Sequence, residues 1–149
     1  MKIEDEIKGR FRNDYHKGFI NITYTVKQLS YAFLQTLKEH DITEAQYNIL
    51  RVLRGFRSEG PSSIGFLKDR MLDKNSDVSR IVDKLFEKKL VDRKEGAKDR
   101  RQKDVEITSA GMELIATMDN CERKVDTFLQ NLTPDEVHEL NRLMDKIRG

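Results

Sequence analysis

The stretch Lys74–Thr108, KNSDVSRIVDKLFEKKLVDRKEGAKDRRQKDVEIT, decides the fold of this 149-residue chain. In its first half, apolar residues recur every three or four positions, which places them on one face of an α-helix. Asn75 or Ser76 is expected to cap this helix, which would put Asp77 in the first turn beside the positive end of the helix dipole. The residues expected on the buried face are Val78, Ile81, Val82, Leu85 and Phe86.

The second half of the stretch changes from helical to alternating periodicity. After a long polar run, Val105 and Ile107 alternate with polar residues, which is typical of a two-stranded hairpin with a polar tip. Gly96 is expected to supply the permissive turn position. Residues 74–103 hold eleven Lys or Arg and six Asp or Glu, a local charge of +5 in a chain of net charge +2. This positive charge on a projecting helix and hairpin indicates a surface that contacts a polyanion, and a helix with a basic wing suggests duplex DNA.

Two further helices are expected before this stretch. Thr43 and Gln46 form a capping-box pattern at the start of the first, and Ser62 or Ser63 can cap the second, which follows the break at Gly60. The second of these helices, a tight turn and the polar-faced helix after it make a helix-turn-helix, and the hairpin makes it winged. The alternative is an ordinary helical hairpin in a core, which leaves the basic hairpin unexplained.

Heptad-like apolar seams flank this module on both sides. They predict one long helix from about residue 11 to 38 and another from Thr108 to about Asn131. A third helix is expected to start at Thr133, where Pro134 and Glu136 complete a strong start signal, and to bury its apolar face. That face consists of Val137, Leu140, Leu143, Met144 and Ile147.

These seams need a partner, and a second copy of the chain is the simplest one, because matching faces close a twofold dimer. The alternative is that the three helices cover one another within one chain. The residues expected in the dimer interface are Tyr15, Phe19, Ile22, Phe128, Leu132, Leu140, Met144 and Ile147.

The composition narrows the class of protein. Charged residues make up 36% of the chain and aromatic residues 7%, with no Trp and two Pro, which favours a mainly α protein with a small β-hairpin wing. No stretch approaches the roughly 20 apolar residues that cross a bilayer, and the first residues lack the apolar segment of a secretory signal. We therefore expect a cytoplasmic protein without a membrane partner. Cys121 falls on a buried helical stripe and is expected to be a core thiol, with a redox switch as the weaker alternative.

Motifs of enzymes and metal sites are missing from the sequence. It has no HExxH, no CxxC pair, no Gly-rich phosphate loop and no Ser in a nucleophile elbow. His16, His40 and His138 lie on separate expected helices, so the less favoured alternative is a zinc site assembled across helices. We expect no catalytic residue, no metal and no cofactor.

In combination, three motifs resemble those of the MarR family of winged helix-turn-helix transcription regulators. They are Thr43, Gln46, Tyr47 and Leu50 on one helix, DVSRIVDKL on the next, and DRRQKDVEITSAG after it. The resemblance assigns the family's Ser-Arg pair to Ser79 and Arg80, its wing Asp-x-Arg to Asp99 and Arg101, and its strand-ending pair to Ile107 and Thr108. Where the family usually has Gly, in the turn that closes the recognition helix, this chain has Lys89.

The resemblance, which covers about Thr43 to Gly111, implies one MarR-like domain over residues 1–149. Its winged helix-turn-helix DNA-binding region would be 43–108 and its dimerisation helices 11–40 and 109–148. It also implies a homodimer on a pseudo-palindromic promoter site.

Side-chain chemistry suggests the DNA contacts at these positions. Lys84 is expected to meet phosphate, Arg101 to enter the minor groove, and Asp99 to fix the wing by pairing with an Arg. The residues expected to reach base edges or phosphates from the start of the recognition helix are Asn75, Ser76, Asp77, Ser79 and Arg80. The generic backbone contacts are Lys94, Lys98, Arg100 and Lys103.

The expected function is a dimeric regulator of transcription, a repressor that leaves double-stranded DNA when a small-molecule effector changes the separation of its two recognition helices. The resemblance places an effector pocket where the terminal helices meet the DNA-binding module. Tyr15, His16, Tyr24 and Tyr47 are candidates for it, no better supported there than as core or surface residues. The alternative function is a winged-helix module that docks on another protein and never contacts bases.

Overall fold

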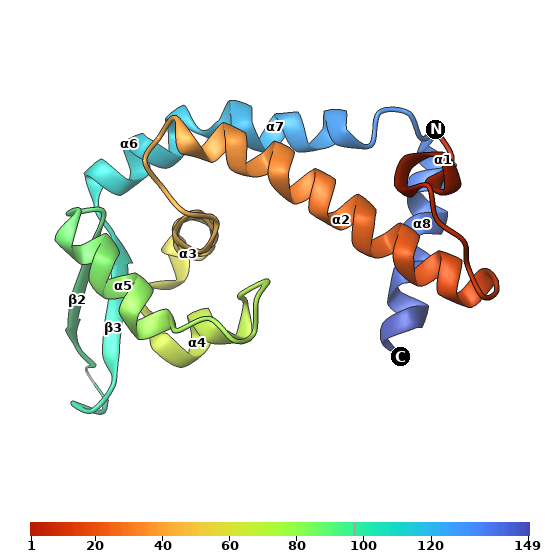
Figure 1. Cartoon of the computed structure of the whole chain (residues 1–149). Helices are drawn as coiled ribbons and strands as arrows, with labels where there is room; N and C mark the ends of the chain where they lie inside the picture. Colours follow the sequence, from red (N-terminus) through yellow and green to blue (C-terminus); the bar gives the residue numbers. More distant parts are fainter. Residues whose placement is uncertain (97) are drawn as a thin grey trace.

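The computed structural model describes residues 1–96 and 98–149. Figure 1 shows a winged module at one end, α2 and α7 side by side as a bridge, and α1 and α8 at the far end with both termini. The elements in chain order are α1 (Ile3–Ile7), α2 (Asp14–Lys38), α3 (Glu44–Gly55), the 3-10 turn η1 (Arg57–Glu59), β1 (Ser62–Ser63), α4 (Ile64–Asp69), α5 (Val78–Glu87), β2 (Val91–Glu95), β3 (Lys103–Ile107), α6 (Ser109–Thr117), α7 (Asp119–Phe128) and α8 (Pro134–Arg148).

One apolar core joins the helix-turn-helix to the wing. Leu50 of α3, Leu67 of α4, Leu85 of α5 and Val105 of β3 are all fully buried in it. Because each of these side chains comes from a different element, the core fixes the position of α5 relative to the strands. The fold is mainly helical with a small antiparallel sheet, as the sequence predicted.

The sheet has three strands in the order β1-β3-β2, so the prediction of a two-stranded hairpin was incomplete. Val91 pairs with Ile107 and Glu95 with Lys103 across the predicted hairpin. On the other side of β3, Ser62 pairs with Val105. Ser63 also caps α4, since its Oγ accepts a hydrogen bond from the backbone N–H of Phe66 at 3.1 Å. A strand of two residues shows no periodicity, and the sequence therefore gave no signal for it.

The start of α5 differs from the prediction. Its cap is Asp77, whose Oδ1 accepts the backbone N–H of Arg80 at 3.2 Å, and not Asn75 or Ser76. The reason is that Asp73 Oδ1 accepts the N–H of Asn75 at 2.9 Å, which keeps this segment in a turn of its own before the helix. The expected favourable first-turn position of the Asp77 carboxylate is thus replaced by a capping role.

The apolar face of α5 is also narrower than predicted. Val78, Val82 and Leu85 are buried, whereas Phe86 is 40% exposed. The guanidinium of Arg93 lies 4.5 Å from the centroid of the Phe86 ring and covers part of it. Phe86 therefore forms the edge of the helix face and carries a cation–π contact with the wing.

α5 ends in a turn that requires a left-handed residue. The N–H of Leu90 donates to the carbonyl of Leu85 at 3.0 Å and the N–H of Lys89 to that of Phe86 at 2.9 Å, the two bonds of a Schellman ending. Lys89 occupies the left-handed position with φ of 61°. The chain keeps the turn that a glycine usually makes and places a lysine in it.

Gly96 has a different role from the predicted one, because its φ is not positive. A Cβ at this position would lie 2.6 Å from the carbonyl oxygen of Asp99. Its own N–H donates to the carbonyl of Gln102 at 2.7 Å. Glycine is needed here for close backbone approach at the wing tip, and not for a special φ.

The terminal helices depart from the prediction at Met118. The expected helix after Thr108 divides into α6 and α7 at Met118, whose N–H is shared between the carbonyls of Leu114 at 3.2 Å and Ile115 at 3.1 Å. α8 starts at the predicted capping box of Thr133 and Glu136. None of its residues is buried in the single chain, so its apolar face is not covered by the other helices of the same chain.

The short helix α1 was not predicted. Ile3 is buried, and the chain holds α1 against α2 through an ion pair between Glu4 and Lys17. Cys121 is buried as predicted for a core thiol, with Sγ 3.8 Å from Nε2 of His40. None of the helices described is long and apolar enough to cross a membrane.

Candidate nucleic-acid interface

The polar face of α5 is exposed beside the wing. Ser79, Arg80 and Lys84 are all exposed on this helix, on the side opposite its buried residues. Asn75 and Asp77 are exposed just before it, and Ser76 is partly covered. The carboxylate of Asp77 is engaged in the cap, and Lys84 Nζ lies 3.6 Å from the carboxylate of Glu87. The residues predicted to contact DNA from this helix therefore share one accessible surface.

An ion pair ties this helix to the wing. Asp83 of α5 pairs with Arg93 of β2, and the same guanidinium stacks on Phe86. Neither residue of this pair was singled out from the sequence. The signal was present in the strand period, because Arg93 follows the buried Val91 by two positions and so points to the same face of the sheet.

The wing tip is held by backbone contacts. Oδ1 of Asp99 accepts the backbone N–H of Arg101 at 3.0 Å, and its carbonyl accepts the N–H of Gln102 at 3.1 Å. Among the described residues, no ion pair joins Asp99 to an arginine side chain, so the predicted Asp–Arg pairing was wrong. Asp99 shapes the turn that precedes Arg101 instead.

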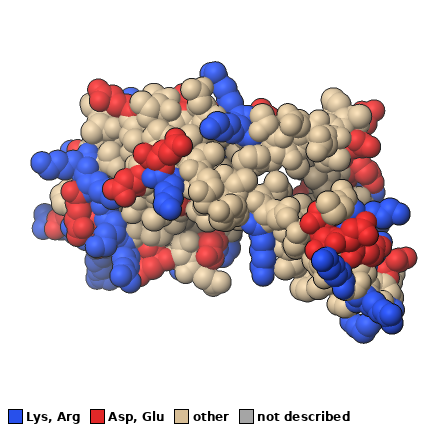
Figure 2. All heavy atoms as spheres, turned by 45° about the horizontal axis from the view of Figure 1, so that its top comes forward, with Lys and Arg blue, Asp and Glu red and all other residues tan. Residues whose placement is uncertain are grey.

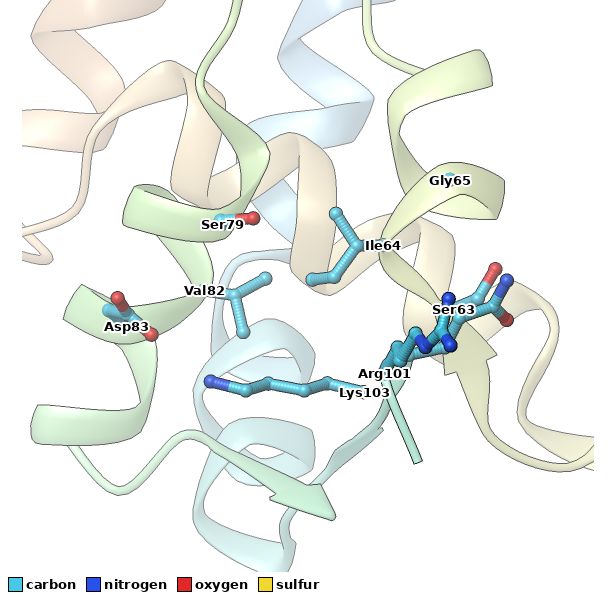
Figure 3. A pocket seen from close by; sticks show the side chains of 9 residues that line it. Ser63, Ile64, Gly65, Ser79, Val82, Asp83, Arg101 and Lys103 are labelled. Carbon is cyan, nitrogen blue, oxygen red and sulfur yellow. The ribbon is translucent and has the colours of Figure 1, made fainter. Parts of the chain in front are cut away.

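A hollow of about 380 Å³ opens between α4, α5 and the wing. Figure 3 shows Lys103 extended across it on the side of Asp83, and Arg101 beside Ser63 at the start of α4. The residues that line the hollow are Ser63, Ile64, Gly65, Ser79, Val82, Asp83, Arg101, Gln102 and Lys103. The structure thus brings two predicted wing cations together with Ser79 of the recognition helix.

Lys94 lies on the other face of the wing. It shares a shallow surface pocket with Asp92, Asp104 and Glu106. In the strand register Asp92 is opposite Glu106 and Lys94 is opposite Asp104. The wing therefore has a basic side toward the hollow and an acidic side away from it. Lys98 and Arg100 are exposed at the tip between the two faces.

A second pocket of about 510 Å³ lies between α2, α3 and α7. Of the four candidates for an effector site, Tyr47 lines this pocket, whereas Tyr15, His16 and Tyr24 do not. Tyr24 donates its hydroxyl to Glu6 of α1 instead. The lining residues are Leu29, Ser30, Phe33, Glu44, Tyr47, Asn48, Arg51, Leu72, Glu122, Val125, Asp126, Phe128 and Leu129.

This second pocket shares a residue with the loop that leads to α5. Leu72 belongs to that loop, and its backbone N–H donates to Oδ1 of the buried Asn48 at 3.0 Å. Burial raises the pKa of the Tyr47 phenol, and the nearby Glu122 carboxylate raises it further. The pocket is thus a partly desolvated space connected to the start of the recognition helix.

Comparison with known proteins gives consistent results. Residues 40–102 match the family model described as MarR family. HTH-type transcriptional repressor IacR of Pseudomonas putida is 29% identical over 112 residues, which cover 74% of this chain and 65% of that protein. The chain thus spans just under two thirds of the length of this relative.

Three solved structures show the same fold. AbsC, a MarR family transcriptional regulator from Streptomyces coelicolor, superposes with a TM-score of 0.82 at 21% identity, over 94% of this chain and 96% of its own. BpsR of Bordetella bronchiseptica, whose DNA binding is regulated by 6-hydroxynicotinic acid, has a TM-score of 0.78 and 21% sequence identity, over 94% of this chain and 98% of its own. MepR of S. aureus, solved in complex with DNA, has a TM-score of 0.74 and 22% sequence identity, over 84% of this chain and 94% of its own.

Proposed function

Because residues 40–102 match the MarR family model, we propose that the chain is a transcription regulator of this family, which binds a pseudo-palindromic promoter site as a homodimer and represses transcription there. One observation carries this proposal. Ser79 of α5 lines one hollow with Arg101 and Lys103 of the wing, so a helix in the major groove and a wing on the backbone can contact the same duplex.

Within this interface, Arg80 is the proposed base contact, because it is exposed near the start of α5 and an arginine can bind guanine O6 and N7 together. Lys84 is the proposed phosphate contact. Arg101 is proposed to enter the minor groove, where a narrow A·T stretch has enhanced negative potential. Lys103 and Ser63 line the hollow from the paired strands β3 and β1 and are suited to a phosphate at its rim.

The uncovered apolar surface supports the homodimer. Tyr15 is 91% exposed, Phe19 67% and Ile147 66%, although all three lie in helices. Figure 2 shows mostly uncharged residues across the middle of one face, with charged residues of both signs toward its two ends. A helix as short as α8 is marginal in water unless its apolar face is packed. A second copy that covers α2 and α8 would supply that packing and hold two recognition helices roughly 34 Å apart, one turn of DNA.

The second pocket supports release by an effector. It lies between α2 and α7, which we propose to be part of the dimer scaffold, and α3, which is part of the DNA-binding module. Asn48 and Leu72 connect it to the loop before α5. A ligand that moves this loop would change the separation of the two recognition helices. Regulation of DNA binding by a small molecule is described for the structurally similar BpsR, with 6-hydroxynicotinic acid.

A gel shift on DNA from upstream of the protein's own gene, with competitor DNA, tests the proposal. We expect a selective shift whose affinity falls steeply with salt. Arg80→Ala should cost about 1–3 kcal/mol and relax sequence choice, whereas Lys84→Ala should weaken all sequences alike. Arg123→Ala on α7 is the matched control, because it removes the same charge away from the interface. Absence of a selective shift would favour the alternative of a protein-docking module.

A further inference from the structure

We propose that the pocket between α2, α3 and α7 binds a hydrophobic organic cation, a ligand with an aromatic body and a permanent positive charge. The proposal deepens the proposed function, since it names the ligand class of the effector pocket. It concerns binding to the protein itself and can therefore be tested without DNA.

The walls of the pocket are suited to an aromatic body. Seven of its thirteen lining residues are apolar or aromatic, and the space of about 510 Å³ is of the size that holds small organic ligands. The rings of Phe33 and Tyr47 meet edge to face at a centroid distance of 5.7 Å. Phe128 contributes a third ring from α7. Aromatic faces attract cations, and more strongly where water is excluded.

The charges on the lining decide the sign of the ligand. The pocket has three carboxylates, those of Glu44, Glu122 and Asp126, and a single cation, Arg51. Arg51 lies 3.4 Å from Glu122 and is engaged with it. Within the described residues, neither Glu44 nor Asp126 forms an ion pair.

The neighbouring charges do not reverse this sign. Arg54 is directed at Asp119, at 2.6 Å, and at Glu122, at 3.4 Å, so its charge is already balanced. A carboxylate ligand would therefore meet no free cation on the lining and would be repelled by two unpaired carboxylates. A cation would meet both carboxylates. Glu44 is partly buried, and Coulomb attraction to it is stronger than in bulk water.

Burial of the Tyr47 phenol is the main cause that raises its pKa, which indicates that this wall of the pocket is partly desolvated. The Glu122 carboxylate raises this pKa further, whereas Arg51 and Arg54 lower it.

Leu72 shows how occupancy would affect α5. Its side chain is 77% exposed and lines the pocket, whereas its backbone is held by Asn48. An apolar ligand body that covers Leu72 would bury this surface and draw the loop before α5 toward the pocket. The ligand class and its regulatory effect thus follow from the same wall.

Two ions of the same shape and opposite charge test the proposal. Tetraphenylphosphonium and tetraphenylborate are titrated by calorimetry into the full-length protein without DNA. We expect the phosphonium ion to bind at least about tenfold more tightly than the borate ion, because the aromatic rings and carboxylates of the pocket attract a cation. Equal binding of the two ions, tighter binding of the borate ion, or no binding of either would overturn the proposal.

Variants place the site. Glu44→Gln and Asp126→Asn should each weaken the phosphonium ion several-fold and leave the borate ion no weaker. Glu113→Gln is the matched control, because this exposed carboxylate of α6 lies outside the pocket. If the two pocket variants bind the phosphonium ion as the control does, the ion binds elsewhere and the proposal is wrong. Release from operator DNA is measured separately by fluorescence anisotropy, so a failure of DNA binding remains distinguishable from a failure of ligand binding.

Discussion

Replacement of Lys89 by glycine is expected to stabilise the protein. Lys89 closes α5 with φ of 61°, a conformation in which a Cβ crowds the following carbonyl group. Glycine adopts this conformation without the clash, and the two hydrogen bonds of the turn, from Lys89 to Phe86 and from Leu90 to Leu85, involve only the backbone and remain.

The magnitude follows from two opposing contributions. The left-handed conformation costs a residue with a Cβ roughly 1–2 kcal/mol. Glycine makes the unfolded chain more flexible, which returns about 0.5–1 kcal/mol of that gain. Lys89→Gly should therefore raise the free energy of unfolding by about 1 kcal/mol, or the melting temperature by about 2–4 °C for a chain of this length.

Thermal and urea unfolding, followed by circular dichroism at one fixed protein concentration, measure this effect. Lys89→Ala is the matched control, because it removes the same charge and keeps the Cβ. Lys124→Gly, in the exposed middle of α7, should destabilise by about 1 kcal/mol. If Lys89→Ala raised the melting temperature as much as Lys89→Gly, the charge and not the backbone would be responsible. A lower melting temperature for Lys89→Gly would refute the reasoning outright.

Three further predictions concern the wing, the pocket and the dimer. Arg93→Gln should weaken DNA binding at low salt without changing how steeply affinity falls with salt. Adding Asp83→Asn should have little further effect, because both substitutions break the same contact between helix and wing. Additive losses of affinity, measured by fluorescence anisotropy, would contradict this prediction. The pKa of Tyr47 in the folded protein is raised above its ordinary value of 10.0. The protonated phenol therefore stabilises the folded state fully below pH 10.0, and this stabilisation is lost as the pH rises through the folded-state pKa. Tyr47→Phe should flatten this alkaline loss in unfolding experiments, and an unchanged slope would show that other groups cause it. Phe19→Glu should convert dimer to monomer in sedimentation velocity, while Lys27→Glu on the same helix should leave the dimer intact; a monomeric parent protein would refute the dimer.

The elements that sequence could predict are those fixed by neighbours along the chain. The caps at Thr43, Ser63 and Thr133 were found because a side chain three residues from a backbone N–H needs no tertiary information. The buried positions of α5 followed from the helical period, which held for Val82 and Leu85.

The features that sequence missed depend on contacts between distant segments or on competition between neighbouring caps. β1 exists because β3 offers a free edge to Ser62. Phe86 was assigned to the core because its period fits, yet Arg93, a wing residue, covers it at the surface. Asp77 took the cap from Asn75 because Asp73 held the preceding turn.

If the chain binds DNA as proposed, the two faces of the wing have a kinetic consequence. Asp92, Asp104 and Glu106 cover the side that turns away from α5, whereas Arg101 and Lys103 line the hollow beside the helix. A duplex that diffuses toward the back of the wing is repelled within a Debye length of about 8 Å, and one that approaches the hollow is attracted. The electrostatic field therefore orients the protein before it contacts a base, and a larger share of encounters begins with the recognition helix facing the groove.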